Sequence, residues 1–364
     1  MHFSQNLTNF ARLKTIKVKM EKKKKKIFLG IFGTLFLIGI TCTGIIYYYL
    51  FAPQFFPQKT AYIYIDRDDT TDSIYNKVKT LGKVKNFTGF KWMSKWRDYP
   101  QNIHTGRYAI RSGENAYHVF NRFYRGHQEP MNLTIGSVRT LDRLARSVGK
   151  QLMIDSAEIA NVMNDSTFQQ KMGYKKETMA CLFIPETYQV YWDISVEDFF
   201  ERMQKEHRKF WNQERMNKAK AIGMAPEEVC ILASIVEEET NNNPEKPMVA
   251  GLYINRLHTD MPLQADPTIK FALQDFGLRR ITNAHLNINS PYNTYRNLGL
   301  PPGPIRIPSP IGLDAVLNYT KHNYIYMCAK EDFSGTHNFA SNYDEHMKNA
   351  RKYWKALNER KIFK

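Results

Sequence analysis

The sequence predicts an α+β protein in three parts: an N-terminal transmembrane helix, a small subdomain of short strands and helices, and a larger α+β domain with a cleft. Three observations lead to this prediction. Residues 27–51 form a long run without charge, and residues 61–151 alternate between short strand-like and helix-like stretches. Residues 223–355 then carry dense polar motifs, which begin at the end of an apolar helix.

The length, hydrophobic content and net charge of the chain limit the kinds of fold and of binding partner to be considered. A chain of 364 residues, 43% of them hydrophobic, is long enough to bury a substantial core and to fold as more than one lobe. Residues 1–26 contain nine Lys or Arg against one acid, a net charge of +8, which leaves +9 of the total +17 for the rest. A moderately basic body fits nucleic acid, anionic lipid or an anionic polymer, and charge alone does not choose among them.

The first predicted element is the apolar segment Ile27–Phe51. A helix of about 20 apolar residues crosses the hydrocarbon core of a membrane, so this segment is long enough to span it. Lys22–Lys26 precede the segment, which predicts a cytoplasmic basic tail at 1–26 and places residues from about 55 onward on the outer side.

A cleaved signal peptide is the alternative interpretation of this segment. The apolar run is longer than an ordinary signal-peptide core, and no small-x-small cleavage site follows before Pro53. These features favour an uncleaved signal anchor at 27–51. Met20 is an alternative start to Met1, because the first 19 residues look unlike the remainder.

The next elements are short units of strand and helix. AYIYI (61–65) and GRYAI (106–110) are predicted strands, and capping residues open the helices predicted within 68–82 and 112–126. The stretch 132–150 repeats the order of strand then helix. Such units are too short for a Rossmann core and suggest a small binding module. Helical patterns then dominate from about residue 158 to residue 211.

Motifs for metal and nucleophile chemistry are missing from the sequence. The four cysteines form no CxxC pair and are expected to be small buried thiols: Cys42, Cys181, Cys230 and Cys328. HExxH, GxSxG and GxxxxGK[ST] do not occur. We therefore expect no metal and no cofactor, which leaves acid–base chemistry by carboxylates.

The stretch ILASIVEEET (231–240) ends an apolar helix in three carboxylates. Pro226 suits its first turn, but acids are disfavoured at the negative, C-terminal end of a helix dipole. Glu239 follows Leu232, Ile235 and Val236 by seven, four and three residues and therefore continues the apolar face. Desolvation there would raise its pKa and suit it to act as a general acid. A solvated charge run, or a Glu paired with Arg or Lys, is the alternative.

Further polar motifs follow in the same region. Asn255 and Arg256 end a helix, and a turn then leads to a Gln expected to be buried, Gln264, and to Asp266 and Thr268. Such residues either brace loops or line a polar groove. SPYNTYRNLGLPPGPIRIPSP (290–310) has the texture of a rigid wall with aromatic faces, or of a ligand for an SH3 or WW domain. His337 precedes a predicted C-terminal helix, and a lone His is more often structural than catalytic.

The ordered motifs IVEEET, NRL, LQADPT, YNTY, GLPPGPI and HNF, together with CLFIPETY (181–188), closely resemble the YceG-like family of bacterial endolytic murein transglycosylases. The resemblance covers about residues 60–355 and is strongest over 180–345. It implies one N-terminal transmembrane helix, a LysM-like binding subdomain at 60–150 and a catalytic domain at 151–355. In this family the catalytic Glu directly precedes Thr, which corresponds to Glu239 here. Glu238 stands where Lys is often found.

The resemblance also implies the chemistry and its partners. One Glu would cleave the bond between N-acetylmuramic acid and N-acetylglucosamine, first as acid and then as base, leaving 1,6-anhydro ends. Peptidoglycan strands and the cell membrane are the expected partners, peptidoglycan synthases are candidates, and nucleic acid is not expected. An inactive wall-binding scaffold and a hydrolase that uses Asp266 as second carboxylate are the alternatives. The residues expected to bind substrate are Thr240, Asn255, Arg256, Gln264, Asp266, Thr268, Tyr292, Asn293, Tyr295 and Glu186.

Overall fold

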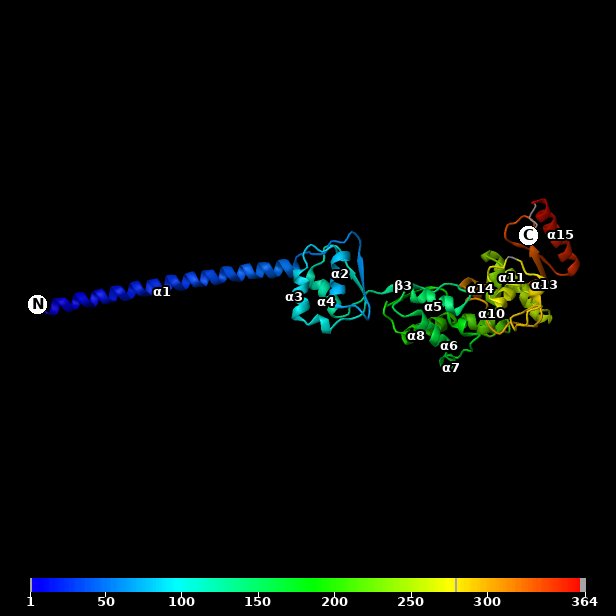
Figure 1. The fold of residues 1–364 in the computed structure, drawn as a ribbon, viewed down its shortest axis with the longest axis horizontal. Coiled ribbons are helices and arrows are strands. Elements are labelled where there is room, and N and C mark those ends of the chain that lie inside the picture. Colours follow the sequence, from blue (N-terminus) through cyan, green and yellow to red (C-terminus); the bar gives the residue numbers. More distant parts are fainter. Residues whose placement is uncertain (1, 279, 361–364) are drawn as a thin grey trace. The chain divides into compact units, whose positions relative to one another are not determined.

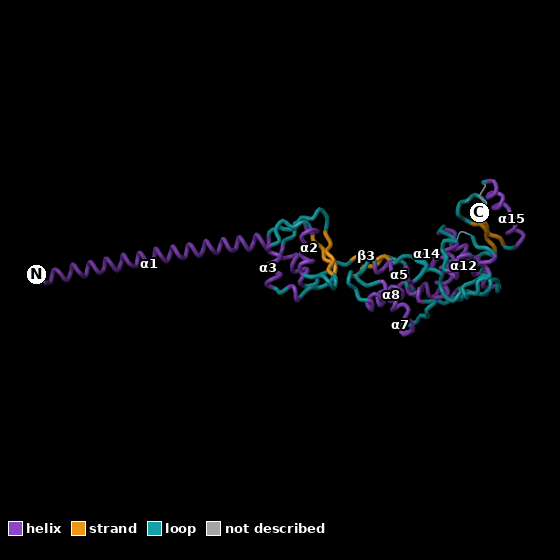
Figure 2. The backbone as a smooth tube through the Cα atoms, in the orientation of Figure 1, coloured by secondary structure: helices purple, strands orange, loops and turns teal. Residues whose placement is uncertain are grey.

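The structure, a computed structural model, describes residues 2–278 and 280–360, and the chain divides between Glu129 and Pro130 into two compact units (Figure 1). Each unit has its own hydrophobic core. Met1, one of the two starts considered from the sequence, lies outside the described residues. Short strands occur as three separate antiparallel pairs in the described chain, and helices make up most of the remaining regular structure (Figure 2).

The first unit begins with the long helix α1 (His2–Ile46), which continues into a π-helical turn, η1 (Tyr47–Phe51). Within the described residues, Lys19–Phe51 is the one helical segment that is long and apolar enough to cross a membrane, and an 18-residue window within it has a mean hydropathy of 2.1. None of that apolar window is buried against the protein. By length and composition, the segment is consistent with the membrane anchor expected from the sequence.

The rest of the first unit is a small α+β body in which β1 (Ala61–Ile65) pairs with β2 (Gly106–Ile110). Its helices are α2 (Thr71–Gly82), α3 (Thr88–Trp96), the 3-10 turn η2 (Tyr99–Gln101) and α4 (Ala116–Tyr124). Thr70 and Asn115 cap α2 and α4 through their side chains, as the capping residues in the sequence predicted. The two strands lie where they were predicted, whereas α3 was not foreseen.

The second unit holds the remaining elements. Its strands are β3 (Met131–Thr134), β4 (Thr187–Val190), β5 (Tyr326–Ala329) and β6 (His337–Ala340). Its helices up to residue 221 are α5 (Leu141–Gly149), α6 (Ser156–Asn164), α7 (Ser166–Met172), η3 (Met179–Leu182), α8 (Val196–Phe210) and α9 (Gln213–Ala221). Those that follow are α10 (Pro226–Glu239), η4 (Asn243–Glu245), α11 (Lys246–His258), α12 (Asp266–Leu273), α13 (Asn283–Leu286), α14 (Pro310–Leu317) and α15 (Tyr343–Glu359).

The first compact unit ends at Glu129, whereas the LysM-like subdomain inferred from the sequence runs to residue 150 and stays a prediction. The third strand-and-helix stretch, β3 with α5, belongs to the second unit because β3 pairs with β4, more than 50 residues further along the chain. In that pairing Leu133 lies opposite Tyr188, and both side chains are buried in one core. Pairing between strands so far apart leaves no mark in the local pattern of either strand.

Helix α10 lies at the centre of the second unit, packed against α11, α12 and α14 (Figure 1). Every residue from Val229 to Val236 is buried, so the helix is enclosed all round rather than on one apolar face as the sequence suggested. Pro226 occupies its first turn, and Thr240 adopts an extended backbone that ends the helix at Glu239. The three carboxylates therefore leave the core together on the last turn.

Candidate active site

Glu237, the first of the three acids, is held by a lysine and a serine. Its Oε2 atom lies 3.2 Å from the Nζ atom of buried Lys246 and accepts a hydrogen bond of 2.9 Å from Ser309 Oγ. Gly312 makes this approach possible, because a Cβ atom there would come within 2.3 Å of the same carboxylate oxygen. These contacts hold the end of α10 against α11 and the start of α14.

Glu238 is held by two arginines from distant segments. Arg139 donates from Nε and Nη2 to its two oxygens at 2.7 and 2.8 Å, and Arg306 donates from Nη1 at 3.0 Å. The Glu238 side chain is only 10% exposed, so this fork of charge-assisted bonds is partly desolvated. The pair with Glu238 raises the pKa of Arg139 above its ordinary value. Glu238 is therefore committed to a structural role by its arginine partners.

Glu239 differs from both neighbours because no Lys or Arg among the described residues forms an ion pair with it. Instead, Tyr253 on α11 donates its hydroxyl to Glu239 Oε1 at 2.7 Å. Burial raises the pKa of Glu239 from 4.5 to about 7; Tyr253 opposes this rise, nearby Asp266 adds to it, and His337 and Arg256 oppose it. A carboxyl group with this pKa carries a proton for much of the time near neutral pH, as a general acid requires.

Two residues expected to bind substrate, Arg256 and Asn255, instead donate their side-chain hydrogen bonds to backbone carbonyls within the protein. Arg256 is buried and donates to the carbonyls of Ile325 and Leu263 at 2.7 and 2.6 Å. Asn255 donates to the carbonyls of His322 and Tyr324 at 2.8 and 2.9 Å. These bonds tie α11 to the turn before α12 and to the segment before β5.

Thr240, also expected at the substrate, is buried and donates to Glu245 Oε2 at 2.9 Å. Glu245 in turn accepts from the backbone nitrogen of His337 at 2.7 Å, and its carboxylate lies 3.0 Å from His337 Nδ1. The residue after Glu239 is thus anchored to β6. His337 therefore has a structural partner, which supports the structural alternative for the lone His, and it also lies near enough to influence Glu239.

Two loops next to Glu239 are joined by threonines. Buried Thr268 donates to the carbonyl of Ala265 at 2.7 Å and lies 2.8 Å from the hydroxyl of Thr294. Asn293 is fully buried, and its amide nitrogen donates to the carbonyls of Leu286 and Ile288 at 2.9 Å each. Thr268 and Asn293 therefore brace the loops, which was one of the two alternatives that the sequence left open.

Gln264, Asp266 and Tyr295 present side chains at the surface of these loops. Gln264 is exposed rather than buried as predicted, and its backbone adopts a left-handed φ of 48°. Asp266 is exposed and accepts a 2.5 Å hydrogen bond from the Tyr295 hydroxyl. Burial raises the pKa of Tyr295 well above its ordinary value, and the nearby carboxyl groups of Asp266 and Glu239 raise it further. The structure thus brings Glu239, Tyr253, Asp266 and Tyr295 together.

Tyr292 and Glu186 lie in other surroundings. Tyr292 packs on Phe271 with ring centroids 4.7 Å apart, and burial raises its pKa to about 12. It lines a cavity of about 350 Å³ whose walls do not include Glu239 or Gln264. Glu186 lines a different hollow, together with Lys209, Phe210 and Arg215. An elongated cleft with both Glu239 and Gln264 on its walls stays a prediction.

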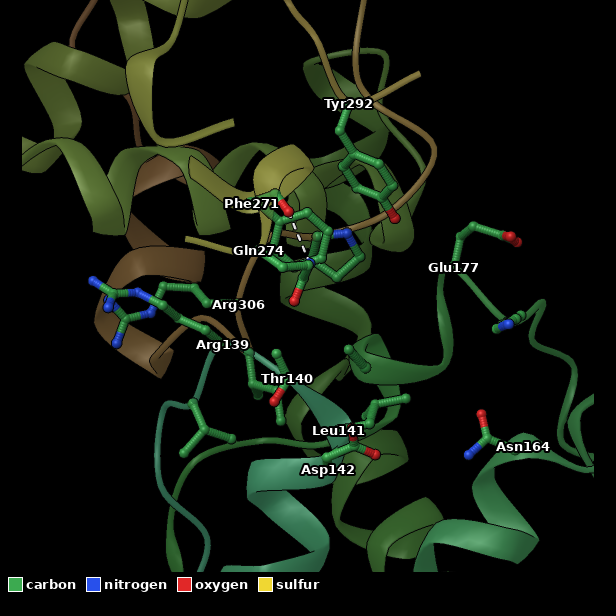
Figure 3. Close-up of a pocket in the computed structure, with 15 residues that line it drawn as sticks. Arg139, Thr140, Leu141, Asp142, Asn164, Glu177, Phe271, Gln274, Tyr292 and Arg306 are labelled. Carbon is green, nitrogen blue, oxygen red and sulfur yellow. Dashed lines mark hydrogen bonds between the residues drawn. The ribbon is translucent and has the colours of Figure 1, made fainter. Parts of the chain in front are cut away.

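The cavity beside Tyr292 is drawn in Figure 3. Arg139 and Arg306, the two partners of Glu238, lie together on one wall, and Phe271, Gln274 and Tyr292 gather on another (Figure 3). Sequence reasoning missed Arg139, Arg306 and Tyr253. A tyrosine inside the apolar run of α11 was the available signal for Tyr253, since a buried hydroxyl usually has a partner. Among the described residues no group of His, Cys, Asp and Glu is arranged to hold a metal ion.

A sequence profile of the YceG-like family matches residues 63–352, which is most of the chain. This chain belongs to the YceG-like family. A crystal structure of a YceG-like protein from Listeria monocytogenes is 26% identical and aligns with a TM-score of 0.54 over 80% of this chain and 99% of that one. The family assigned from the sequence motifs is confirmed.

Curated relatives carry the name endolytic murein transglycosylase. One from Bacillus subtilis is 26% identical over 317 residues, covering 83% of this chain and 87% of that protein. One from Streptococcus pneumoniae serotype 2 is 25% identical over 319 residues, covering 79% of this chain and 57% of that protein. This YceG-like chain thus matches only a little over half the length of the pneumococcal relative.

The first prediction concerns the ion pairs of Glu238. Replacing Glu238 by Gln leaves two partly buried guanidinium groups without their counter-charge, and we expect a loss of about 2 kcal/mol in the free energy of unfolding. Thermal and urea unfolding of the purified chain in detergent would measure it. Glu214→Gln is the matched control: it removes an exposed helical pair with Lys218, which solvent screens, and it should cost clearly less than Glu238→Gln. Equal losses in both variants would contradict the structural role of Glu238.

The second prediction concerns pH. Because the pKa of Glu239 is about 7 in the folded chain and 4.5 ordinarily, the folded state binds more protons between these values. The stability from this carboxyl is present in full below pH 4.5 and is lost as pH rises through 7. Wild type should therefore lose stability relative to Glu239→Gln across this window, as measured by urea unfolding at a series of pH values. Tyr253→Phe should extend the decline to higher pH, and parallel profiles for wild type and Glu239→Gln would refute the raised pKa.

Proposed function

We propose that this YceG-like protein is an endolytic peptidoglycan lytic transglycosylase. It cleaves nascent glycan strands between N-acetylmuramic acid and N-acetylglucosamine and leaves 1,6-anhydro ends. Membership of the family and the printed names of the curated relatives support this activity. The observation that carries the proposal for the site is the environment of Glu239. It is the one acid of the three on the last turn of α10 that is held by a tyrosine instead of a cation.

The proposed reaction uses Glu239 twice. The protonated carboxyl gives its proton to the bridging oxygen, and the bond between that oxygen and the anomeric carbon breaks. The C6 hydroxyl of the muramic acid attacks the anomeric carbon and loses its proton to the Glu239 carboxylate, which restores the acid. Tyr253 stabilises the carboxylate between these steps through its hydrogen bond to Oε1. The protons and bonds balance without a metal, a cofactor or a second carboxylate.

A hydrolase is the second candidate, favoured by the position of Asp266. Asp266 lies near enough to Glu239 to raise its pKa and is exposed, so it is available to activate a water molecule. Its Oδ1 atom, however, already accepts the hydrogen bond from Tyr295. The inactive wall-binding scaffold is the third possibility. Mass spectrometry of digested strands separates the three, since the products are anhydro ends, reducing ends or uncut strands.

The placement of the protein in the cell is part of the proposal. Residues 27–51 anchor the chain in the cytoplasmic membrane, residues 1–26 remain in the cytoplasm, and the residues from about 55 onward lie on the outer side with the glycan. The small α+β body within 60–150 serves as a LysM-like binding subdomain. The bias of Lys22–Lys26 toward the cytoplasmic side supports this orientation. Peptidoglycan synthases, which supply nascent strands, are the candidate protein partners.

The third prediction tests the catalytic acid. Glu239→Gln removes the transferable proton with little change in shape, so cleavage of purified glycan strands should fall by at least about a thousandfold while the fold persists. Release of anhydro ends would be followed by chromatography and mass spectrometry. Glu237→Gln, which leaves Glu239 untouched, should cost less activity per folded molecule. The reverse ranking would assign the acid to Glu237.

The fourth prediction tests orientation. Protease added to intact spheroplasts should digest the chain after residue 55, because that part lies outside the membrane. Antibody detection of an N-terminal tag would show a short protected fragment that contains residues 1–51. Protection of the C-terminal unit from the protease would contradict the orientation and, with it, access to the wall.

A further inference from the structure

The cavity lined by Tyr292 carries more charge than a neutral sugar requires. Among the residues that line its volume of about 350 Å³ are five with ionisable acidic or basic side chains: Arg139, Asp142, Lys176, Glu177 and Arg306. In a strand that carries its peptides, the N-acetylated sugars themselves offer hydroxyl and amide groups for recognition and no charge. A cavity of this size that holds both cations and anions suits a ligand with charges of both signs.

The charges in the cavity fall into two groups. Arg139 and Arg306 are already committed to Glu238. Asp142, Lys176 and Glu177 are exposed, and within the described part of the chain they take part in no ion pair. These three side chains are therefore free to meet carboxylate and ammonium groups of a ligand.

An aromatic wall completes the cavity. The rings of Phe271 and Tyr292 pack together with centroids 4.7 Å apart, and Figure 3 shows them beside Gln274 and above Thr140. Gly303 brings the loop of Glu177 against this wall, because a Cβ atom there would come within 2.0 Å of the Glu177 carbonyl and 3.0 Å of the Tyr292 hydroxyl. Such a wall suits the aliphatic parts of short side chains.

The cavity is built from the same segments as the proposed catalytic site. Helix α10 supplies Glu239 to the proposed catalytic site. The next residue toward its N-terminus, Glu238, binds Arg139 and Arg306, which line the cavity. Helix α12 supplies Asp266 to the proposed catalytic site and Phe271 to the cavity. The two residues are five positions apart, which corresponds to about 7.5 Å along a helix axis. An extended peptide of about five residues reaches roughly 16 Å. A peptide that branches from a sugar held at Glu239 is thus long enough to enter the cavity.

We propose that this cavity binds the peptide that branches from the muramic acid of the substrate, with its carboxylate and amino groups at Lys176, Asp142 and Glu177 and its aliphatic part on Phe271 and Tyr292. The inference rests on the proposed function, which supplies the strand. It makes the protein selective for strands that still carry peptides and gives the cavity a separate task from bond cleavage.

The test compares two substrates with three forms of the full chain in detergent. One substrate is purified glycan with its peptides, and the other is the same glycan after an amidase has removed them. Wild type should cleave the peptide-bearing strands with a kcat/KM about tenfold higher. Lys176→Gln should raise KM for these strands by about threefold or more, with kcat little changed, and should leave the stripped strands unaffected. Lys175→Gln, in the same exposed loop but outside the cavity, is the matched control and should change neither.

A second variant keeps the test decisive. Asn164→Trp places a large ring at the rim of the cavity and should weaken cleavage of peptide-bearing strands alone. Equal cleavage of both substrates by wild type would overturn the proposal. So would equal effects of Lys176→Gln on both substrates, or identical behaviour of Lys175→Gln and Lys176→Gln.

Binding separates this proposal from the proposed activity. Glu239→Gln should retain higher affinity for peptide-bearing than for stripped strands in pull-down assays, and Lys176→Gln added to it should reduce the difference. If wild type cuts neither substrate but Glu239→Gln keeps this preference, the activity fails and the peptide site stands. If cleavage yields anhydro ends without any preference, the activity stands and the peptide site fails.

Discussion

The structure of the second unit depends on how one buried helix end accommodates three carboxylates. Helix α10 is enclosed on all sides and ends with its negative dipole pole beside Glu237, Glu238 and Glu239. Three adjacent charges in that position would repel one another strongly in a partly desolvated site. The fold resolves the conflict in three different ways: a buried lysine for Glu237, two arginines for Glu238, and burial that raises the pKa of Glu239.

Neutralising the first two acids also assembles the surroundings of the third. Lys246 opens α11, Arg139 precedes α5, and Arg306 lies in the proline-rich segment before α14. Arg306 further donates to the hydroxyl and carbonyl oxygens of Ser137 at 3.0 and 3.1 Å, which joins its segment to the loop of Arg139. Contacts to Glu237 and Glu238 therefore fix three segments of the chain around the last turn of α10.

Local features of the sequence predicted many of the helices and strands. They could not predict which residues far apart in the sequence would contact each other. Thr70 and Asn115 mark helix starts because a cap acts within three residues. Arg139 and Glu238, in contrast, are 99 residues apart, and the sequence around either residue does not indicate that the other is its partner. The polar motifs were found, but their residues divide into braces such as Asn293 and exposed groups such as Gln264, a division that depends on which side chains the packed loops enclose.

The balance of influences on Glu239 explains why a tyrosine, rather than a cation, is its partner. In the proposed reaction Glu239 must both give and take a proton, so its carboxylic acid and carboxylate forms must be close in free energy near the working pH. Each pKa unit changes the difference between the two forms by about 1.4 kcal/mol. An arginine pair like that of Glu238 would hold the carboxylate and prevent donation. Burial alone, reinforced by Asp266, would disfavour the carboxylate that must exist after donation. The Tyr253 hydroxyl donates to the carboxylate without adding a full charge, and it therefore offsets part of the desolvation while leaving the proton transferable near neutral pH.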